Sequence, residues 1–223
     1  DARWTFVFLH RPLWLYPAPS GFAKIEKLLE GRRHTVIAGH FHRYVHEFRN
    51  STNYYVLAST GGGSKLRGPR YGEFDHVTLV TVSDDGPVMA NITLDGILPH
   101  DVTTRDDYDL TESLAQSADL PYLVLTDSEE AVSAGTIYLT LWNPSHRELQ
   151  VKAKFQHAHE VKMDPAHFEM TLPARSEKVV EVKVQSSEAI STKMPALLQL
   201  HWILGFDLAK KEELYLSGTR DIP

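Results

Sequence analysis

One short stretch near the beginning of the chain decides its fold: His34-Thr35-Val36-Ile37-Ala38-Gly39-His40-Phe41-His42. Residues 34–38 are a brief, mostly apolar run, which predicts a strand buried on both faces of a sheet. Gly39 ends this strand, and His40 and His42 follow directly. Side chains two residues apart point to opposite faces of an extended backbone. We therefore expect Gly39 to permit a turn that brings both imidazoles toward one centre.

A second buried strand is predicted upstream, in the aromatic-rich run Trp4-Thr5-Phe6-Val7-Phe8-Leu9, which ends at His10. The proline-rich segment 12–19 can continue neither a strand ladder nor a helix. Residues 22–29 then have apolar side chains at helical spacing. Together these segments predict a strand, helix, strand unit that belongs to a sheet covered by helices. In such sheets, ligand sites lie at the carboxyl ends of the strands, where the histidines stand.

Downstream of this unit the helical signal fades. Strands are predicted at 54–58, 76–82 and 88–94, because these runs are rich in β-branched and aromatic residues. They are separated by the glycine run 61–63 and by Asp84-Asp85-Gly86-Pro87. The second of these breakers predicts a hairpin between the last two strands.

An acidic, turn-rich stretch at 106–109, followed by a weakly amphipathic piece at 110–120, interrupts the strand pattern. Domain boundaries fall in such polar connecting segments. We therefore expect a first domain at 1–98, a linker at 99–128 and a second domain at 129–223.

The second domain has short alternating strands separated by proline-containing turns. Regular spacing of strands and turns over this length predicts an antiparallel sandwich of about seven strands, similar in size to an immunoglobulin-like domain. The individual strands are expected at 136–142, 148–155, 168–172, 178–184, 196–204 and 213–216.

Composition excludes several classes of function. The 223 residues include 23 Lys and Arg against 29 Asp and Glu, so the formal charge is −6, and no basic run is longer than Arg32-Arg33. This charge pattern argues against binding to a nucleic acid duplex. No apolar run approaches the roughly 18 to 20 residues that cross a bilayer, so no membrane span is expected. Since there is no cysteine, any metal must be held by nitrogen and oxygen.

Three histidines, His10, His40 and His42, stand at or just beyond the ends of the two predicted parallel strands. Neutral imidazole is a common ligand of zinc, iron and manganese. A single histidine at a strand end is more often a hydrogen-bonded structural residue than a ligand. The combination of one strand that ends in His-x-Pro with another that ends in Gly-His-x-His favours a metal site.

These motifs resemble those of a known family, the calcineurin-like metallophosphoesterases. The resemblance extends over about residues 3–95. It is carried by Phe6-Val7-Phe8-Leu9-His10-Arg11-Pro12, Thr35-Val36-Ile37-Ala38-Gly39-His40-Phe41-His42-Arg43-Tyr44 and the strand and glycine turn Tyr54-Tyr55-Val56-Leu57-Ala58-Ser59-Thr60-Gly61-Gly62-Gly63.

The resemblance implies hydrolysis of a phosphate ester at a two-metal centre of divalent transition metals, with zinc, iron or manganese as the expected ions. His10 and His40 would bind one metal and His42 the other. Arg11 and Arg43 stand beside these histidines, and each is a candidate to pair with a phosphate oxygen of the substrate. Each could equally be a solvated surface cation.

The chain also departs from the family pattern. Family members carry Asp-x-His, Gly-Asp-x-x-Asp and Gly-Asn-His-Asp/Glu motifs upstream of the His-x-Pro strand, and none of these occurs in the 223 residues. We therefore expect the C-terminal part of such an enzyme, inactive without the N-terminal half of the catalytic domain. The expected fold class is α+β and mainly β: the C-terminal part of a metallophosphoesterase α/β sandwich, then an antiparallel immunoglobulin-like β-sandwich.

Other motifs carry less weight. His157-Ala158-His159 has no partner motif and is expected to be a surface feature, and Gly61-Gly62-Gly63-Ser64-Lys65 lacks the spacing of a phosphate loop. Two alternatives to an enzyme stay open. The first is a non-catalytic binding protein on a degenerate phosphoesterase scaffold, whose sandwich recognises protein or carbohydrate, and the second is a structural surface module.

Overall fold

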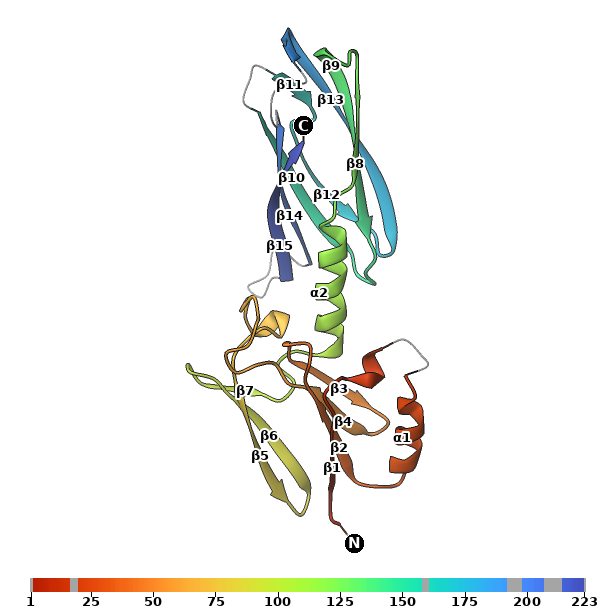
Figure 1. Cartoon of the computed structure of the whole chain (residues 1–223), viewed down its shortest axis with the longest axis vertical. Helices are drawn as coiled ribbons and strands as arrows, with labels where there is room; N and C mark the ends of the chain where they lie inside the picture. Colours follow the sequence, from red (N-terminus) through yellow and green to blue (C-terminus); the bar gives the residue numbers. More distant parts are fainter. Residues whose placement is uncertain (1, 17–19, 158–160, 192–197, 207–213, 223) are drawn as a thin grey trace. The chain divides into compact units, whose positions relative to one another are not determined.

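The structure is a computed structural model in which the chain is mostly β, with several antiparallel sheets. It separates into two compact units, Asp1–Tyr108 and Asp109–Pro223, which are treated separately below as unit 1 and unit 2 (Figure 1). The residues described are 2–16, 20–157, 161–191, 198–206 and 214–222.

Unit 1 is built around a four-stranded sheet with the strand order β1-β2-β4-β3. Strand β1 pairs in parallel with β2, β2 in parallel with β4, and β4 antiparallel with β3. The predicted strand, helix, strand unit is thereby confirmed, whereas β3 was not predicted. The elements are β1 (Thr5–Phe8), the short 3-10 helix η1 (Leu13–Leu15), α1 (Phe22–Leu29), β2 (His34–Ala38), β3 (Val45–Arg49) and β4 (Thr52–Val56).

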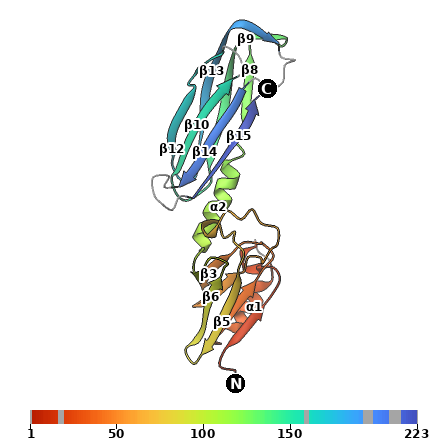
Figure 2. The same ribbon diagram turned by 90° about the vertical axis from the view of Figure 1, so that its left-hand side faces the viewer.

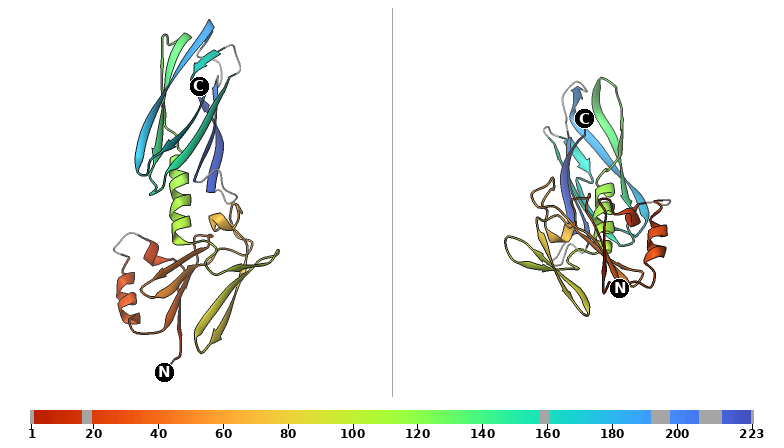
Figure 3. Two further views of the ribbon diagram at one scale, coloured as in Figure 1. Left: turned by 180° about the vertical axis from the view of Figure 1, so that it is seen from behind. Right: turned by 60° about the horizontal axis from the view of Figure 1, so that its bottom comes forward.

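Strand β2 lies at the centre of unit 1 and is buried along its whole length. On one face, Val36 packs with Tyr54 and with Phe22 of α1. On the other face, Ile37 packs in a cluster that includes Met89 of a second sheet. Helix α1 and the second sheet therefore cover opposite faces of the four-stranded sheet, as the two views of Figures 1 and 3 show.

Strand β1 differs from the prediction that both of its faces are buried. It is an edge strand, paired on one side only, and the Phe8 side chain is 72% exposed. Its aromatic side chains match the pattern of a central strand, but burial depends on which neighbours the sheet supplies. In the described structure, β1 has a strand partner on one edge only, and the Phe8 ring is exposed.

The second sheet of unit 1 has three antiparallel strands in the order β5-β6-β7, and β7 was not predicted. These strands are β5 (Val77–Ser83), β6 (Gly86–Ile92) and β7 (Ile97–Pro99), preceded by the 3-10 helix η2 (Pro69–Tyr71). The predicted hairpin is confirmed by the pairing of Ser83 with Gly86. One face of this sheet is apolar yet exposed, and its side chains include Val77, Leu79, Val88 and Ile97.

The segment 99–128, expected to be a linker, contains helix α2 (Arg105–Ser117) and strand β8 (Tyr122–Thr126). The acidic run that was interpreted as a turn is the first turn of α2. Thr104 and Asp107 form a reciprocal cap there: the Asp107 carboxylate accepts from the Thr104 backbone N–H at 2.9 Å, and the Thr104 hydroxyl accepts from the Asp107 N–H at 3.3 Å. Such a cap, with acidic residues near the helix N-terminus, stabilises the helix.

Neither of the two α-helices in the described ranges is long and apolar enough to cross a membrane.

Unit 2 is an antiparallel sandwich of two four-stranded sheets within the described residues, with the orders β12-β10-β14-β15 and β11-β13-β9-β8 (Figure 2). Alternate side chains fill its core, as Ile137, Leu139 and Leu141 do from β9. Strands β8 and β11 were not predicted. Besides β8, the strands of unit 2 are β9 (Ala131–Asn143), β10 (Leu149–His157), β11 (Val161–Asp164), β12 (His167–Leu172), β13 (Ser176–Ser191), β14 (Leu198–Phe206) and β15 (Leu214–Ile222).

The position of β8 leads to a first prediction, on truncation. A polypeptide of residues 109–223 should melt cooperatively, because it contains both sheets and their core. A polypeptide of residues 129–223 lacks β8, which pairs with β9 along its whole length. We expect the shorter chain to lose about 1–3 kcal/mol of unfolding free energy, a drop in Tm of roughly 5–15 °C by circular dichroism. Equal Tm values would show that β8 adds nothing to the sandwich.

Two buried histidines of unit 1, His46 and His76, couple its stability to pH. Burial lowers the pKa of both rings from the ordinary value of 6.5. The His76 ring packs against Tyr44 and Phe74, and its Nδ1 has no hydrogen-bond partner within the described part of the chain. Below pH 6.5 the unfolded chain therefore binds protons that the folded chain does not.

The second prediction follows from this difference. The free energy of unfolding of unit 1 should be highest above the ordinary histidine pKa and should fall as the pH drops from about 7.5 to 5.5, by up to about 1.4 kcal/mol per pH unit for each ring. His76→Phe removes one titrating group and should flatten the decrease in thermal melts. His167→Gln, at an exposed position of unit 2, is the matched control and should leave the slope unchanged. An unaltered slope in His76→Phe would contradict this account.

Candidate metal centre

His10 and His40 are brought together by the parallel pairing of β1 with β2. The backbone ladder continues beyond both strands, since the Leu9 N–H donates to Ile37 O and the Gly39 N–H donates to His10 O, each at 3.1 Å. His40 Nδ1 lies 3.1 Å from His10 Nε2. The ring centroids are 4.9 Å apart with an interplanar angle of 71°. Residues thirty positions apart in sequence therefore share one edge of the sheet.

The spacing of this pair fits the shell of a divalent cation. Two imidazole nitrogens, each about 2.0–2.1 Å from a tetrahedral metal, lie roughly 3.3 Å from one another. The observed 3.1 Å between His40 Nδ1 and His10 Nε2 is close to that value. In the structure the two rings share a hydrogen bond at this distance, which a bound metal would replace. Both side chains are accessible, so an ion can reach them from solvent.

The His42 ring is oriented by the glycine turn that follows β4. Its Nδ1 lies 2.8 Å from the carbonyl oxygen of Gly63. Because a carbonyl only accepts hydrogen bonds, Nδ1 carries the ring hydrogen and Nε2 keeps the lone pair. Histidines that bind metals commonly have this arrangement, in which a backbone carbonyl fixes the non-ligating nitrogen.

The turn after β2 is made differently from the sequence-based prediction. Gly39 was expected to supply the unusual backbone conformation, but the left-handed residues are His40, with φ of 75°, and His42, with φ of 53°. Left-handed backbone is uncommon in residues other than glycine and tends to occur at functional sites. The left-handed backbone at His40 and His42 therefore sets the direction of both imidazoles, and Gly39 does not adopt a left-handed conformation.

The environment of His40 favours the neutral ring. Desolvation lowers the pKa of His40 from 6.5, and electrostatic interaction with Arg11 and with the His10 and His42 rings lowers it further. A neutral imidazole is the form that binds a metal. The ring is therefore available as a ligand at neutral pH.

The glycine turn is itself held in place by residues that were not singled out from the sequence. Asp75 Oδ1 accepts a hydrogen bond from the Gly61 backbone N–H at 2.9 Å, and the Thr60 hydroxyl donates to the carbonyl of His76 at 2.7 Å. No local signal in the sequence links Asp75 to the turn, because the two are joined only by the fold. Asp75 thus positions the segment whose carbonyl orients His42.

Arg11 and Arg43, the two candidate phosphate-binding residues, differ in their surroundings. Arg43 Nε lies 3.2 Å from Glu73 Oε1, and Arg67 binds the same carboxylate at 2.5 and 2.8 Å. Burial opposes ionisation of Glu73, but hydrogen bonds and charge from Arg67 and Arg43 outweigh it and lower its pKa. The Arg43 guanidinium is therefore engaged in a partly buried ion pair. Arg11 is exposed and close enough to His40 to influence its charge.

The three histidines do not form a complete metal site. Within the described ranges, no group of three or more His, Asp or Glu side chains is arranged to hold a metal ion. His10 and His40 converge as a pair, while His42 is directed by Gly63. For the second His-x-His sequence, only the backbone of His157 is described; Ala158 and His159 lie outside the described residues.

Comparison with known proteins adds no family assignment. No protein-family model matches the chain, and no curated protein matches its sequence. The functional argument therefore depends on the geometry of this site and on the motifs that form it.

The third prediction compares two adjacent glycines of the turn. A Cβ added at Gly62 would lie 2.9 Å from Ser59 Cβ, whereas one added at Gly63 would meet His42 Nδ1 at an ordinary 3.8 Å. Gly62→Ala should therefore displace the turn, lower the free energy of unfolding by about 1–3 kcal/mol and alter the His42 ring resonances. Gly63→Ala, the matched control, should leave the free energy of unfolding and the His42 resonances nearly unchanged. Similar ¹⁵N ring shifts and Tm values for the two variants would contradict the proposed support of His42.

Proposed function

We propose that this chain is the C-terminal part of a metal-dependent phosphoesterase that resembles the calcineurin-like metallophosphoesterases, followed by an immunoglobulin-like sandwich. The observation that carries the proposal is the 3.1 Å approach of His40 Nδ1 to His10 Nε2 at the carboxyl edge of two parallel strands. His42, oriented by a backbone carbonyl, stands on the same turn. The substrate class is a phosphate ester.

In this proposal, His10 and His40 hold one divalent transition-metal ion, and Nε2 of His42 contributes to a second. Zinc, iron and manganese suit these nitrogen ligands. When bound, a pair of such ions supplies Lewis acidity and an activated water for attack on phosphorus. The chain's own residues fix the geometry: the paired strands set the spacing of His10 and His40, and Gly63 sets the tautomer of His42.

Arg11 is the better of the two candidates for contact with substrate. Its exposed guanidinium lies beside the histidine pair and can donate two parallel hydrogen bonds to phosphate oxygens. Arg43 is held by Glu73, so we assign it to the support of the loop between β2 and β3. Loss of Arg11 would weaken substrate binding, and loss of Arg43 would loosen the loop that carries His42.

The centre needs carboxylates that this segment does not bring to it. Two dipositive ions held by three neutral imidazoles would leave their charge uncompensated. We propose that the N-terminal half of the catalytic domain supplies these groups. The unpaired edge of β1 and the exposed apolar face of the β5-β6-β7 sheet are surfaces that a further layer would cover.

A second candidate function is a non-catalytic binding protein on a degenerate phosphoesterase scaffold. It is favoured by the lack of a three-ligand metal group among the described residues. The two functions differ in whether the complete protein hydrolyses a phosphate ester.

The fourth prediction separates them. Purified residues 1–223 should not hydrolyse p-nitrophenyl phosphate or bis(p-nitrophenyl) phosphate with Mn²⁺ or Zn²⁺, because the compensating carboxylates are missing. A longer gene product that includes the N-terminal half, or that half added separately, should restore turnover. In the restored enzyme, His40→Ala or His42→Ala should lower kcat by about 100-fold or more. His146→Ala, at an exposed position of unit 2, is the matched control and should have no effect.

Two outcomes would overturn parts of this proposal. Hydrolysis by residues 1–223 alone would show that the centre is complete without a further half. A complete protein without activity on either ester in either metal would favour the binding protein.

A further inference from the structure

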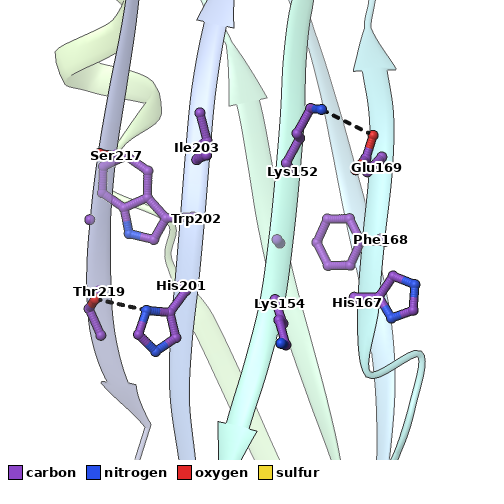
Figure 4. Close-up of a pocket in the computed structure, with 12 residues that line it drawn as sticks. Lys152, Lys154, His167, Phe168, Glu169, His201, Trp202, Ile203, Ser217 and Thr219 are labelled. Atoms are coloured by element: carbon purple, nitrogen blue, oxygen red, sulfur yellow. Dashed lines mark hydrogen bonds and ion pairs between the residues drawn. The ribbon is translucent and has the colours of Figure 1, made fainter.

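The sheet β12-β10-β14-β15 of unit 2 has a groove on its outer face, with a volume of about 650 Å³. All four strands contribute to its lining (Figure 4). Lys152 and Lys154 of β10 alternate with the buried residues Val151, Ala153 and Phe155, so their side chains point away from the sandwich core. Volumes of this size are typical of sites for small molecules.

Two rows of side chains cross this groove, each with one residue from every strand. The strand register places His167, Lys154, His201 and Thr219 in the first row. The second row contains Glu169, Lys152, Ile203 and Ser217. Neighbours within a row are about 4.5–5.5 Å apart at Cβ, so the groups of one row can act on a single ligand.

The two lysines differ in how their charge is balanced. Lys152 Nζ lies 3.4 Å from Glu169 Oε2, as the dashed line in Figure 4 shows. Lys154 is flanked in its row by the rings of His167 and His201, with no carboxylate opposite it. An anion bound in the groove would pair with the Lys154 ammonium.

His201 orients a hydroxyl group of the first row. Its Nδ1 lies 3.2 Å from the hydroxyl of Thr219. When the ring hydrogen resides on Nδ1, it is donated to the hydroxyl oxygen, and the hydroxyl hydrogen can be donated to an oxyanion in the groove. His201 Nε2 is shielded from solvent, so it takes no part in binding.

We propose that this groove binds a small organic ester of phosphate or sulfate. The tetrahedral oxyanion accepts hydrogen bonds from the Lys154 ammonium and the Thr219 hydroxyl. The organic part of the ligand lies on the Ile203 side chain and the aliphatic stems of the lysines, and its hydroxyls can donate to Glu169. This role does not depend on hydrolysis in unit 1.

The test uses glucose 6-phosphate and glucose 6-sulfate as probes of the full chain, with glucose and inorganic phosphate as controls. We expect both esters to bind with Kd on the order of 1 mM or tighter and to shift the backbone amide resonances of β10 and β14. Inorganic phosphate should bind more weakly because it leaves the apolar lining unused, and glucose should not bind. Tighter binding of the sulfate ester or of the phosphate ester identifies which oxyanion the groove prefers.

Lys154→Met keeps most of the side-chain length and removes the charge, so it should weaken binding of the preferred ester by about tenfold or more. Lys162→Met is the matched control, since Lys162 is an exposed lysine of β11 on the other sheet. It should bind like the parent chain, and thermal melts of both variants check that the sandwich is intact. Unchanged affinity in Lys154→Met, equal binding of glucose, or no resonance shifts with either ester would overturn the proposal.

Discussion

The parallel pairing of β1 with β2 is the constraint on which the candidate metal centre depends. Its register sets Phe8 opposite Ile37, and two further backbone hydrogen bonds extend the ladder to His10 and Gly39. A one-residue slip in this register would turn His10 away from His40, because successive side chains of a strand face opposite sides. The core fixes the register, since Val36 and Ile37 pack into separate apolar clusters on the two faces of β2.

The loops that follow these strands also position the histidines. Left-handed backbone at His40 and His42 is a local cost that the surrounding contacts must offset. Those contacts include the carbonyl of Gly63, which holds the His42 ring, and Asp75, which holds the glycine turn through the Gly61 N–H. The site is therefore positioned by three segments that are distant in sequence, and each uses backbone groups to orient a side chain.

In unit 2, the alternation of side chains along each strand produces both a core and an outer groove. One set of alternate side chains forms the core between its sheets, and the other set on β12, β10, β14 and β15 forms a groove that carries more basic than acidic groups. The rows that cross this groove exist only because four strands pair in register. His201 and Lys154 are forty-seven positions apart in sequence but adjacent in the sheet, so neither residue alone indicates a site.

The sequence by itself determined the elements with strong local signals: the β2 strand at 34–38, the helix at 22–29, the hairpin before Gly86 and the placement of His10 and His40 at two strand ends. The sequence also contained the Thr104–Asp107 helix cap, a local signal that was missed because the acidic run at 106–109 was interpreted as a turn. Only the tertiary structure decided that β1 is an edge strand, that Arg43 is held by Glu73 and that Asp75 supports the glycine turn. Periodicity and turn chemistry act between neighbours in the chain, whereas edge exposure, ion pairs and cross-strand rows arise from contacts between segments far apart, which local patterns do not encode.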